Sequence, residues 1–419
     1  MAQNTLALYG VQFGTFVVPL VTLPYVSRVL GDSAFGLVVF AQGFAFLLII
    51  VLDFGFTASA TRAVSINRND PQALARAVAS TQGAKLMLIG AALAASLVAV
   101  VALPQLREHP DYAAYATIAA LASGLTPWWY FLGSEKVRLS SLIQLAGRVA
   151  AAALTFVLVK DADDGWLILA LWAGALVLTS STLNLMMYRR VRLLAPRLKE
   201  AGASLKESAV LFVGVGALSL YTSANVVLLG LFASNAQVAH FGAAERVVRA
   251  GSQVIGPVMV AVYPRLSFLG SEGRQDRAER LAWVALAVLG AVGLLGGALV
   301  FALAPLIISV VFGPDFEESV PLLRILALIL PLTTVANVAA GFMASMRMDA
   351  TLSKIILFGG VLNVALACAF VPAFGPIGMA CSVVAAEAAV LAGCAVAIRR
   401  QRAVPRLVPE GEAGAGGSR

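Results

Sequence analysis

Long apolar segments alternate with short polar or charged connections along almost the whole chain of 419 residues. A helix needs about 20 mainly apolar residues to cross the hydrocarbon core of a bilayer. The eighth segment fits least well, because it contains Glu245, Arg246 and Arg249. The first has no basic stretch before it and no small-residue cleavage pattern, so we expect a retained span rather than a cleaved leader. The pattern predicts twelve membrane-spanning helices, at residues 5–26, 35–60, 85–103, 112–132, 137–159, 165–188, 208–232, 238–263, 281–310, 320–344, 352–371 and 376–398.

The basic residues are distributed very unevenly among the connections. Counted from the connection after the second span, alternate connections and the C-terminal tail hold 23 of the 30 Lys and Arg residues. The opposite connections hold only three, and the remaining four lie inside spans. Because cytoplasmic loops of membrane proteins are enriched in Lys and Arg, both chain termini are predicted to be cytoplasmic.

The composition excludes several classes of protein. Apolar residues make up 60% of the chain and charged residues 12%, and the mean hydropathy is +0.89. Soluble domains contain about 45–50% apolar and about 25% charged residues. A soluble enzyme, a nucleic-acid-binding domain and a secreted disulfide scaffold are therefore excluded. The net charge of +8 reflects the basic loops, so nucleic acid is not an expected partner.

The two halves of the chain show a weak internal repeat. With a shift of 203 residues, the pattern Phe35-Gly36-x3-Phe40-Ala41 aligns with Val238-Ala239-x-Phe241-x2-Ala244, and Arg62 aligns with Arg265. Each copy holds six predicted helices, an even number, so both copies enter the membrane from the same side. Parallel repeats of this kind are related by an axis along the membrane normal, and transporters built from them bind substrate between the halves.

These patterns predict an all-α integral membrane fold. Twelve transmembrane helices form two parallel-repeat six-helix lobes around a central cationic cavity, with both termini in the cytoplasm. The expected segments are an N-terminal lobe at 1–188, a basic cytoplasmic linker at 189–206, a C-terminal lobe at 207–398 and a disordered cytoplasmic tail at 399–419.

The eighth span carries the most informative charges. Glu245 and Arg249 are four residues apart, in the order that favours an ion pair on one helix face. A charge at mid-membrane costs roughly 2.5–3.5 kcal/mol on insertion scales, so it normally faces a wet cavity or a partner. The pair leaves Arg246 without an acid on its own helix, which favours a polar cavity that needs positive charge. The alternative is a self-neutralised pair that packs between helices.

Other charged residues lie inside or beside the predicted spans. Arg148 is near the centre of the fifth span, and Glu387, central in the twelfth, is either its partner or a proton carrier. Asp53 lies in the cytoplasmic third of the second span, and Arg28 and Arg62 bracket the first hairpin. The surplus of arginine suits an anion, and a planar guanidinium matches phosphate especially well. We expect the cavity to bind substrate through Arg28, Arg62, Arg148, Arg246 and Arg249, with Asp53, Glu245 and Glu387 as coupling residues or charge partners.

Two further groups of residues leave alternatives open. Trp128, Trp129 and Tyr130, near the inner end of the fourth span, fit either an aromatic belt at the membrane interface or a platform for stacking sugars. Asn225, Asn337 and Asn363 each either bond between helices or touch substrate.

The chain contains no pattern typical of catalysis. Its two histidines, His109 and His240, lie in a loop and at a span end, and there is no P-loop, nucleophile elbow or metal-ligand spacing. We therefore expect no catalytic residues, no metal site and no cofactor.

The first hairpin resembles the opening of a known family. The shared residues are Gln12, Pro19-Leu20-x-Thr22-x-Pro24-Tyr25-x-Ser27-Arg28-x-Leu30-Gly31, Phe35-Gly36, Phe40-Ala41, Asp53-Phe54-Gly55-Phe56, Thr61-Arg62 and Phe131-x-Gly133-x-Glu135-Lys136. They are similar to those of bacterial polysaccharide flippases, the Wzx-type O-antigen transporters of the multidrug/oligosaccharidyl-lipid/polysaccharide (MOP) exporter superfamily. The match covers roughly residues 1–140.

The resemblance implies two six-helix lobes in a V around a cationic cavity in the bacterial cytoplasmic membrane. It also implies transport of undecaprenyl-diphosphate-linked oligosaccharide from the inner to the outer leaflet, with the bilayer and the polysaccharide polymerase machinery as further partners. At matching positions Arg28, Arg62, Asp53 and the arginines of the eighth span line the cavity in that superfamily.

Two other hypotheses compete with a flippase. A cation-coupled multidrug exporter of the same superfamily handles mostly cationic molecules, for which an acidic cavity is expected, so the arginine surplus disfavours it. A membrane polymerase or ligase acting on lipid-linked sugars needs a sizeable outer loop, whereas every outer connection here is short.

Overall fold

The structure is a computed structural model that describes residues 2–253, 265, 268, 275–346 and 348–403. Within these ranges every regular element is a helix. The elements are α1 (Ala2–Asp53), α2 (Phe56–Asn67), α3 (Pro71–Ala102), α4 (Pro104–Glu108), α5 (Pro110–Leu125), α6 (Trp128–Gly133), α7 (Val137–Leu158), η1 (Ala162–Asp164), α8 (Gly165–Tyr188), α9 (Leu198–Ser223), α10 (Asn225–Gly230), α11 (Asn235–Gln253), α13 (Gln275–Val311), η2 (Pro314–Phe316), α14 (Ser319–Ala327), α15 (Ile329–Ser345) and α16 (Asp349–Ala403).

Several of these helices are long and apolar enough to cross a membrane. Seven stretches of the described residues meet this criterion: Val21–Asn67, Pro71–Ala102, Val137–Leu158, Ala162–Tyr188, Arg280–Val311, Ser319–Ser345 and Asp349–Gln401. The prediction of an all-helical, multi-pass membrane protein is therefore confirmed. The end of the predicted eighth span, 254–263, and most of the predicted tail, 404–419, lie outside the described residues.

Two of the long helices each hold two predicted spans. In α1 the helical path breaks at Gly31, with φ 69° and ψ −177°, and in α16 it breaks at Gly375, with φ 55° and ψ −134°. Positive φ costs glycine little because it has no Cβ. A single glycine therefore turns the chain at the first and at the last predicted hairpin, without a separate loop.

The third predicted span begins too late. The hydropathy pattern predicts that this span begins at Lys85, at the end of the cytoplasmic connection. In the structure α3 already begins at Pro71, after Asp70, whose side chain accepts hydrogen bonds from the backbone N–H groups of Gln72 and Ala73. Lys85 consequently lies well inside α3 with 2% of its surface exposed. Helix α9 begins at Leu198, within the predicted linker at 189–206.

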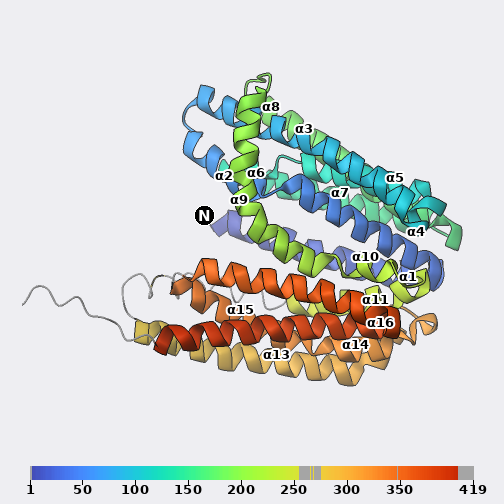
Figure 1. The fold of residues 1–419 in the computed structure, drawn as a ribbon. Helices are drawn as coiled ribbons and strands as arrows, with labels where there is room; N and C mark the ends of the chain where they lie inside the picture. Colours follow the sequence, from blue (N-terminus) through green and yellow to red (C-terminus); the bar gives the residue numbers. More distant parts are fainter. Residues whose placement is uncertain (1, 254–264, 266–267, 269–274, 347, 404–419) are drawn as a thin grey trace, which may run out of the picture.

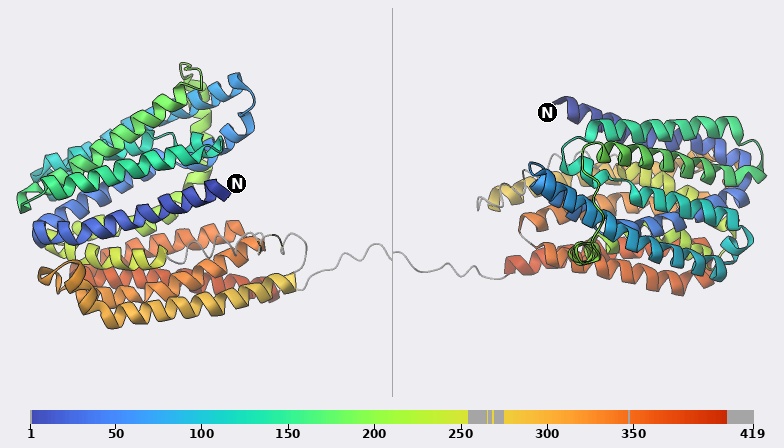
Figure 2. Two further views of the ribbon diagram at one scale, coloured as in Figure 1. Left: turned by 180° about the vertical axis from the view of Figure 1, so that it is seen from behind. Right: turned by 90° about the horizontal axis from the view of Figure 1, so that it is seen from above.

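The helices gather in two groups (Figures 1 and 2). We call α1–α8 the N-terminal bundle and α11–α16 the C-terminal bundle. Helix α9 runs from the first group toward the second, and α10 continues beside α1 (Figure 1). Within the N-terminal bundle α1 is the element that faces the other group, and its main partner there is α11.

One close approach between the bundles joins positions that the predicted repeat aligns. A Cβ on Gly36 would collide with the carbonyl oxygen of Asn235 and lie 3.2 Å from the nitrogen of Ala239. A Cβ on Gly242 would lie 2.7 Å from Cγ1 of Val39. The shift of 203 residues pairs Gly36 with Ala239 and Val39 with Gly242. Contacts between a position and its own equivalent are what a two-fold relation produces at its axis.

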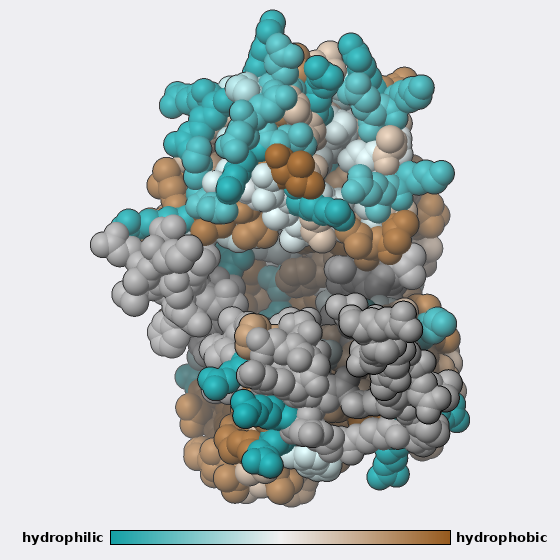
Figure 3. All heavy atoms as spheres, turned by 90° about the vertical axis from the view of Figure 1, so that its left-hand side faces the viewer, coloured by the Kyte–Doolittle hydropathy of each residue, from teal (hydrophilic) through white to brown (hydrophobic). Residues whose placement is uncertain are grey.

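The same end of the molecule is closed by further contacts between the bundles. Nη2 of Arg28 donates to the carbonyl oxygen of Val310 at 2.6 Å, and Oγ of Ser27 donates to that of Phe312 at 3.3 Å. The rings of Phe35 and Phe312 pack edge to face, with centroids 6.4 Å apart. Seen from the left-hand side of Figure 1, the surface is hollowed between the two bundles (Figure 3). The bundles therefore meet at one end and separate toward the other.

Candidate functional site

Arg246 lies at the junction of the two bundles. It projects from α11, and its Nη2 donates to Oε1 of Gln42 on α1 at 2.7 Å. Its guanidinium carbon lies 5.1 Å from the ring centroid of Phe35, also on α1, in cation–π range. The sequence offers Arg246 no acidic partner on its own helix. The partner is an amide 204 residues earlier in the chain, which no local spacing could reveal.

The predicted pair on α11 forms and is part of a larger network. Nη2 of Arg249 donates to Oε1 of Glu245 at 2.8 Å, and the side chains are 44% and 12% exposed. The same carboxylate oxygen accepts from Nδ2 of Asn225 at 3.0 Å, and Oδ1 of Asn225 accepts from Nδ2 of Asn363 at 2.9 Å. The two asparagines thus bond between α10, α11 and α16. These hydrogen bonds hold the carboxylate of Glu245 in place, while the side chain of Arg249 remains exposed.

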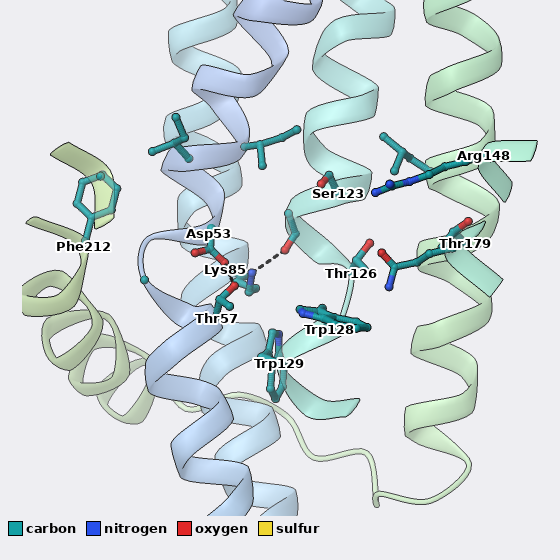
Figure 4. Close-up of a pocket in the computed structure, with 17 residues that line it drawn as sticks. Asp53, Thr57, Lys85, Ser123, Thr126, Trp128, Trp129, Arg148, Thr179 and Phe212 are labelled. Carbon is teal, nitrogen blue, oxygen red and sulfur yellow. Dashed lines mark hydrogen bonds between the residues drawn. The ribbon is translucent and has the colours of Figure 1, made fainter. Parts of the chain in front are cut away.

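A second cluster surrounds a cavity of about 380 Å³ between the helices of the N-terminal bundle and α9 (Figure 4). Asp53 and Arg148, two of the predicted site residues, both line it, as does Gln144. Trp128 and Trp129 line it at the lower end in Figure 4. This segment is not an aromatic belt at the lipid interface. Trp129 and Tyr130 are each only 2% exposed, whereas the side chains of such a belt face the lipid.

Lys85 holds two helix ends together at the floor of this cavity. Its Nζ donates to the carbonyl oxygen of Gly124 at 2.6 Å and to that of Leu52 at 3.4 Å. These carbonyls lie in the last turns of α5 and α1, where backbone oxygens lack a partner within the helix and carry partial negative charge. Asp53 lies beside them and accepts from Oγ1 of Thr57 at 2.6 Å. The residue that hydropathy assigned to a loop is thus a buried cross-link.

Replacing Lys85 with methionine is expected to lower the free energy of unfolding by about 2–4 kcal/mol, because two buried carbonyl groups would lose their donor. Thermal unfolding of the purified protein in detergent measures this effect. Arg76→Ala, on the exposed side of the same helix, is the matched control and should change stability by no more than about 0.5 kcal/mol. Equal stability of both variants would contradict the cross-link.

Comparisons with known proteins identify the family. The family model described as "Polysaccharide biosynthesis protein" matches residues 1–269, more than half of the chain. The chain belongs to this family. The resemblance predicted from the first hairpin is therefore confirmed, and it extends well past residue 140.

Relatives of this chain include a protein of Shigella dysenteriae named "Putative O-antigen transporter". It is 27% identical over 395 residues, which cover 92% of this chain and 97% of the relative. A solved inward-facing MATE-family multidrug transporter of the MOP superfamily superposes with a TM-score of 0.71 at 15% identity, covering 92% of this chain and 95% of its own. The lipid II flippase MurJ, in an inward closed conformation, gives 0.70 at 13% identity, covering 95% of this chain and 88% of its own. The chain thus has the fold of these transporters.

Three predicted site residues remain, one each on α1, α2 and α16. Arg28 is at the closed end, bonded to Val310, and Arg62 is exposed on α2. Glu387 is buried in α16 with 9% of its surface exposed. Among the described residues no three His, Cys, Asp or Glu side chains are grouped closely enough to hold a metal ion.

Proposed function

We propose that this protein is a flippase that moves undecaprenyl-diphosphate-linked oligosaccharide from the inner to the outer leaflet of the bacterial cytoplasmic membrane by alternating access. The observation that carries this proposal is Arg246 on α11, bonded to α1 across the junction of the bundles, with Arg249 exposed one turn further along. A cleft with guanidinium groups at its junction suits the diphosphate of the lipid carrier. Membership of the polysaccharide biosynthesis family and similarity to the Shigella protein support the same substrate class.

The physical problem that such a protein solves is the transfer of a polar headgroup through hydrocarbon. Sugars and a diphosphate would lose their hydrogen bonds to water in the bilayer core, at a cost of several kcal/mol for each unpaired group. A polar cleft between two bundles replaces those bonds, while the prenyl tail stays in the lipid. Outward movement of negative charge is also favoured by an inside-negative potential, by about 2.3 kcal/mol per charge per 100 mV.

The proposed topology is twelve spans in two lobes, 1–188 and 207–398, joined by a cytoplasmic linker at 189–206 and followed by a tail at 399–419, with both termini in the cytoplasm. Contacts between equivalent positions, Gly36 with Ala239 and Val39 with Gly242, support a two-fold relation between the lobes. On this topology the closed end faces outward and the hollow in Figure 3 faces the cytoplasm, where the lipid-linked substrate is made. Delivery to the outer leaflet would supply the polysaccharide polymerase machinery.

Transport into the outer leaflet can be measured directly. The purified chain is reconstituted in liposomes that contain a fluorescent undecaprenyl-diphosphate sugar, and a membrane-impermeant quencher reports which leaflet holds the probe. We expect transfer that depends on the protein and accelerates with a membrane potential. Transfer no faster than in protein-free liposomes would contradict the proposal.

A cation-coupled multidrug exporter is the second candidate, supported by the fold similarity to the MATE-family transporter. The two candidates separate in cells that overproduce the chain. An exporter raises the inhibitory concentrations of cationic drugs, whereas a flippase leaves them unchanged and restores surface polysaccharide in a strain that lacks its own transporter.

A further inference from the structure

Two neighbouring indole rings occupy one end of the cavity in the N-terminal bundle. Trp128 lies below Thr126 and is partly exposed, and Trp129 lies beside it with 2% of its surface exposed (Figure 4). Both line the cavity, whose volume of about 380 Å³ is in the range of small-molecule sites. Indole faces bind the apolar faces of flat or ring-shaped ligands, and the N–H adds one directed donor.

The indole nitrogen of Trp129 is a buried donor that bonds to no group in the described part of the chain. Its nitrogen edge is turned toward the space between Lys85 and Trp128 (Figure 4). Buried polar groups are normally satisfied, so an unmatched donor facing a cavity indicates that an acceptor belongs in the cavity. A ligand oxygen at this position would complete the site.

Two cations, Lys85 and Arg148, and one carboxylate, Asp53, line the cavity. Arg148 extends from α7 toward Ser123 (Figure 4), and Asp53 faces the cavity from the end of α1. The ammonium of Lys85 is already bonded to two carbonyl groups and is buried. The groups available to a ligand are therefore one cation, one carboxylate, the amide of Gln144 and several hydroxyls, which supply both donors and acceptors.

We propose that this cavity binds a sugar ring of the lipid-linked glycan, separately from the diphosphate. A neutral, hydroxyl-bearing ring matches the indole faces, the unmatched N–H and the mixed set of donors and acceptors, whereas a diphosphate would meet one available cation beside a carboxylate. The inference rests on the proposed function. Two separate sites would then bind the substrate. The arginines of α11 would bind the diphosphate of the carrier, and the cavity in the N-terminal bundle would bind the sugar.

Binding to the purified full-length chain in detergent tests this division. The probes are undecaprenyl diphosphate alone and undecaprenyl diphosphate that carries one N-acetylglucosamine, N-acetylgalactosamine, glucose or galactose. We expect at least one glycosylated probe to bind the wild type about tenfold more tightly than the bare carrier. Trp128→Ala and Trp129→Phe should remove most of this difference and leave affinity for the bare carrier unchanged. Trp129→Phe keeps the aromatic packing and removes only the N–H donor.

Trp283→Ala is the matched control, because Trp283 is 56% exposed on α13, away from the cavity. It should keep the full preference for the glycosylated probe. The proposal is overturned if no sugar improves binding, if both tryptophan variants keep the preference, or if free monosaccharides compete as well as the lipid-linked ones. Failure of the wild type to bind even the bare carrier would instead contradict the proposed flippase function.

Discussion

Replacing Arg246 with alanine is expected to slow leaflet transfer in proteoliposomes by about 10- to 100-fold, because a charge-assisted hydrogen bond is worth about 1.5–3 kcal/mol. The guanidinium joins α11 to Gln42 and Phe35 of α1 and carries positive charge at the junction of the bundles. Arg246→Lys separates these two contributions. Lysine keeps the charge and loses the planar fork, so an intermediate rate is expected if the fork matters for phosphate.

Arg324→Ala provides the control for this comparison. Arg324 also lies over an aromatic ring, 5.6 Å from the centroid of Phe301, but it is on an exposed face of α14. Its loss should leave the initial rate within about twofold of the wild type, since exposed single charges contribute little. Equal rates for Arg246→Ala and the wild type, at matched protein content per liposome, would remove the main support for the cationic junction.

Adding one methyl group at Gly36 is expected to open the closed end of the molecule. The Cβ of Gly36→Ala would overlap the carbonyl oxygen of Asn235, which is backbone and cannot swing aside. Overpacking of this kind costs about 1–3 kcal/mol, enough to shift a two-state population by about tenfold or more. Spin labels on Glu108→Cys and Asp315→Cys, with the native cysteines replaced by alanine, report the separation of the bundles at that end. Their distance distribution should move to longer values.

Gly90→Ala is the matched substitution for this test, because a Cβ on Gly90 of α3 would meet nothing within 4 Å. It should leave the distance distribution unchanged. The same distribution in Gly36→Ala would mean that contact between α1 and α11 does not hold the end closed. Both variants must elute as monodisperse protein, so that unfolding is not mistaken for opening.

The sequence could predict contacts between residues close together in the chain, but not contacts between residues far apart in it. The ion pair of Glu245 and Arg249 was predictable because a helix brings residues four apart together. The partner of Arg246 was not, since Gln42 becomes its neighbour only when the bundles meet. Hydropathy found the apolar segments but misjudged Lys85, because an apolar window treats a buried ammonium and a loop ammonium alike.

The repeat was a similar case. Its residue matches were few, yet they included the small residues at the crossing of α1 and α11. Close approach of two backbones admits only small side chains at the crossing point, so Gly36 and Ala239 are constrained on both sides of this crossing. These small residues at the crossing support the predicted relation between the halves.

The buried ammonium of Lys85 has one more consequence. The ammonium is part of a side chain of α3, so it cannot dissociate or exchange with ions in solution as a bound metal ion can. The helix ends that it clamps should therefore keep their geometry in sodium-free and potassium-free buffers alike. The cavity beside them would then keep its shape whichever monovalent cation is present.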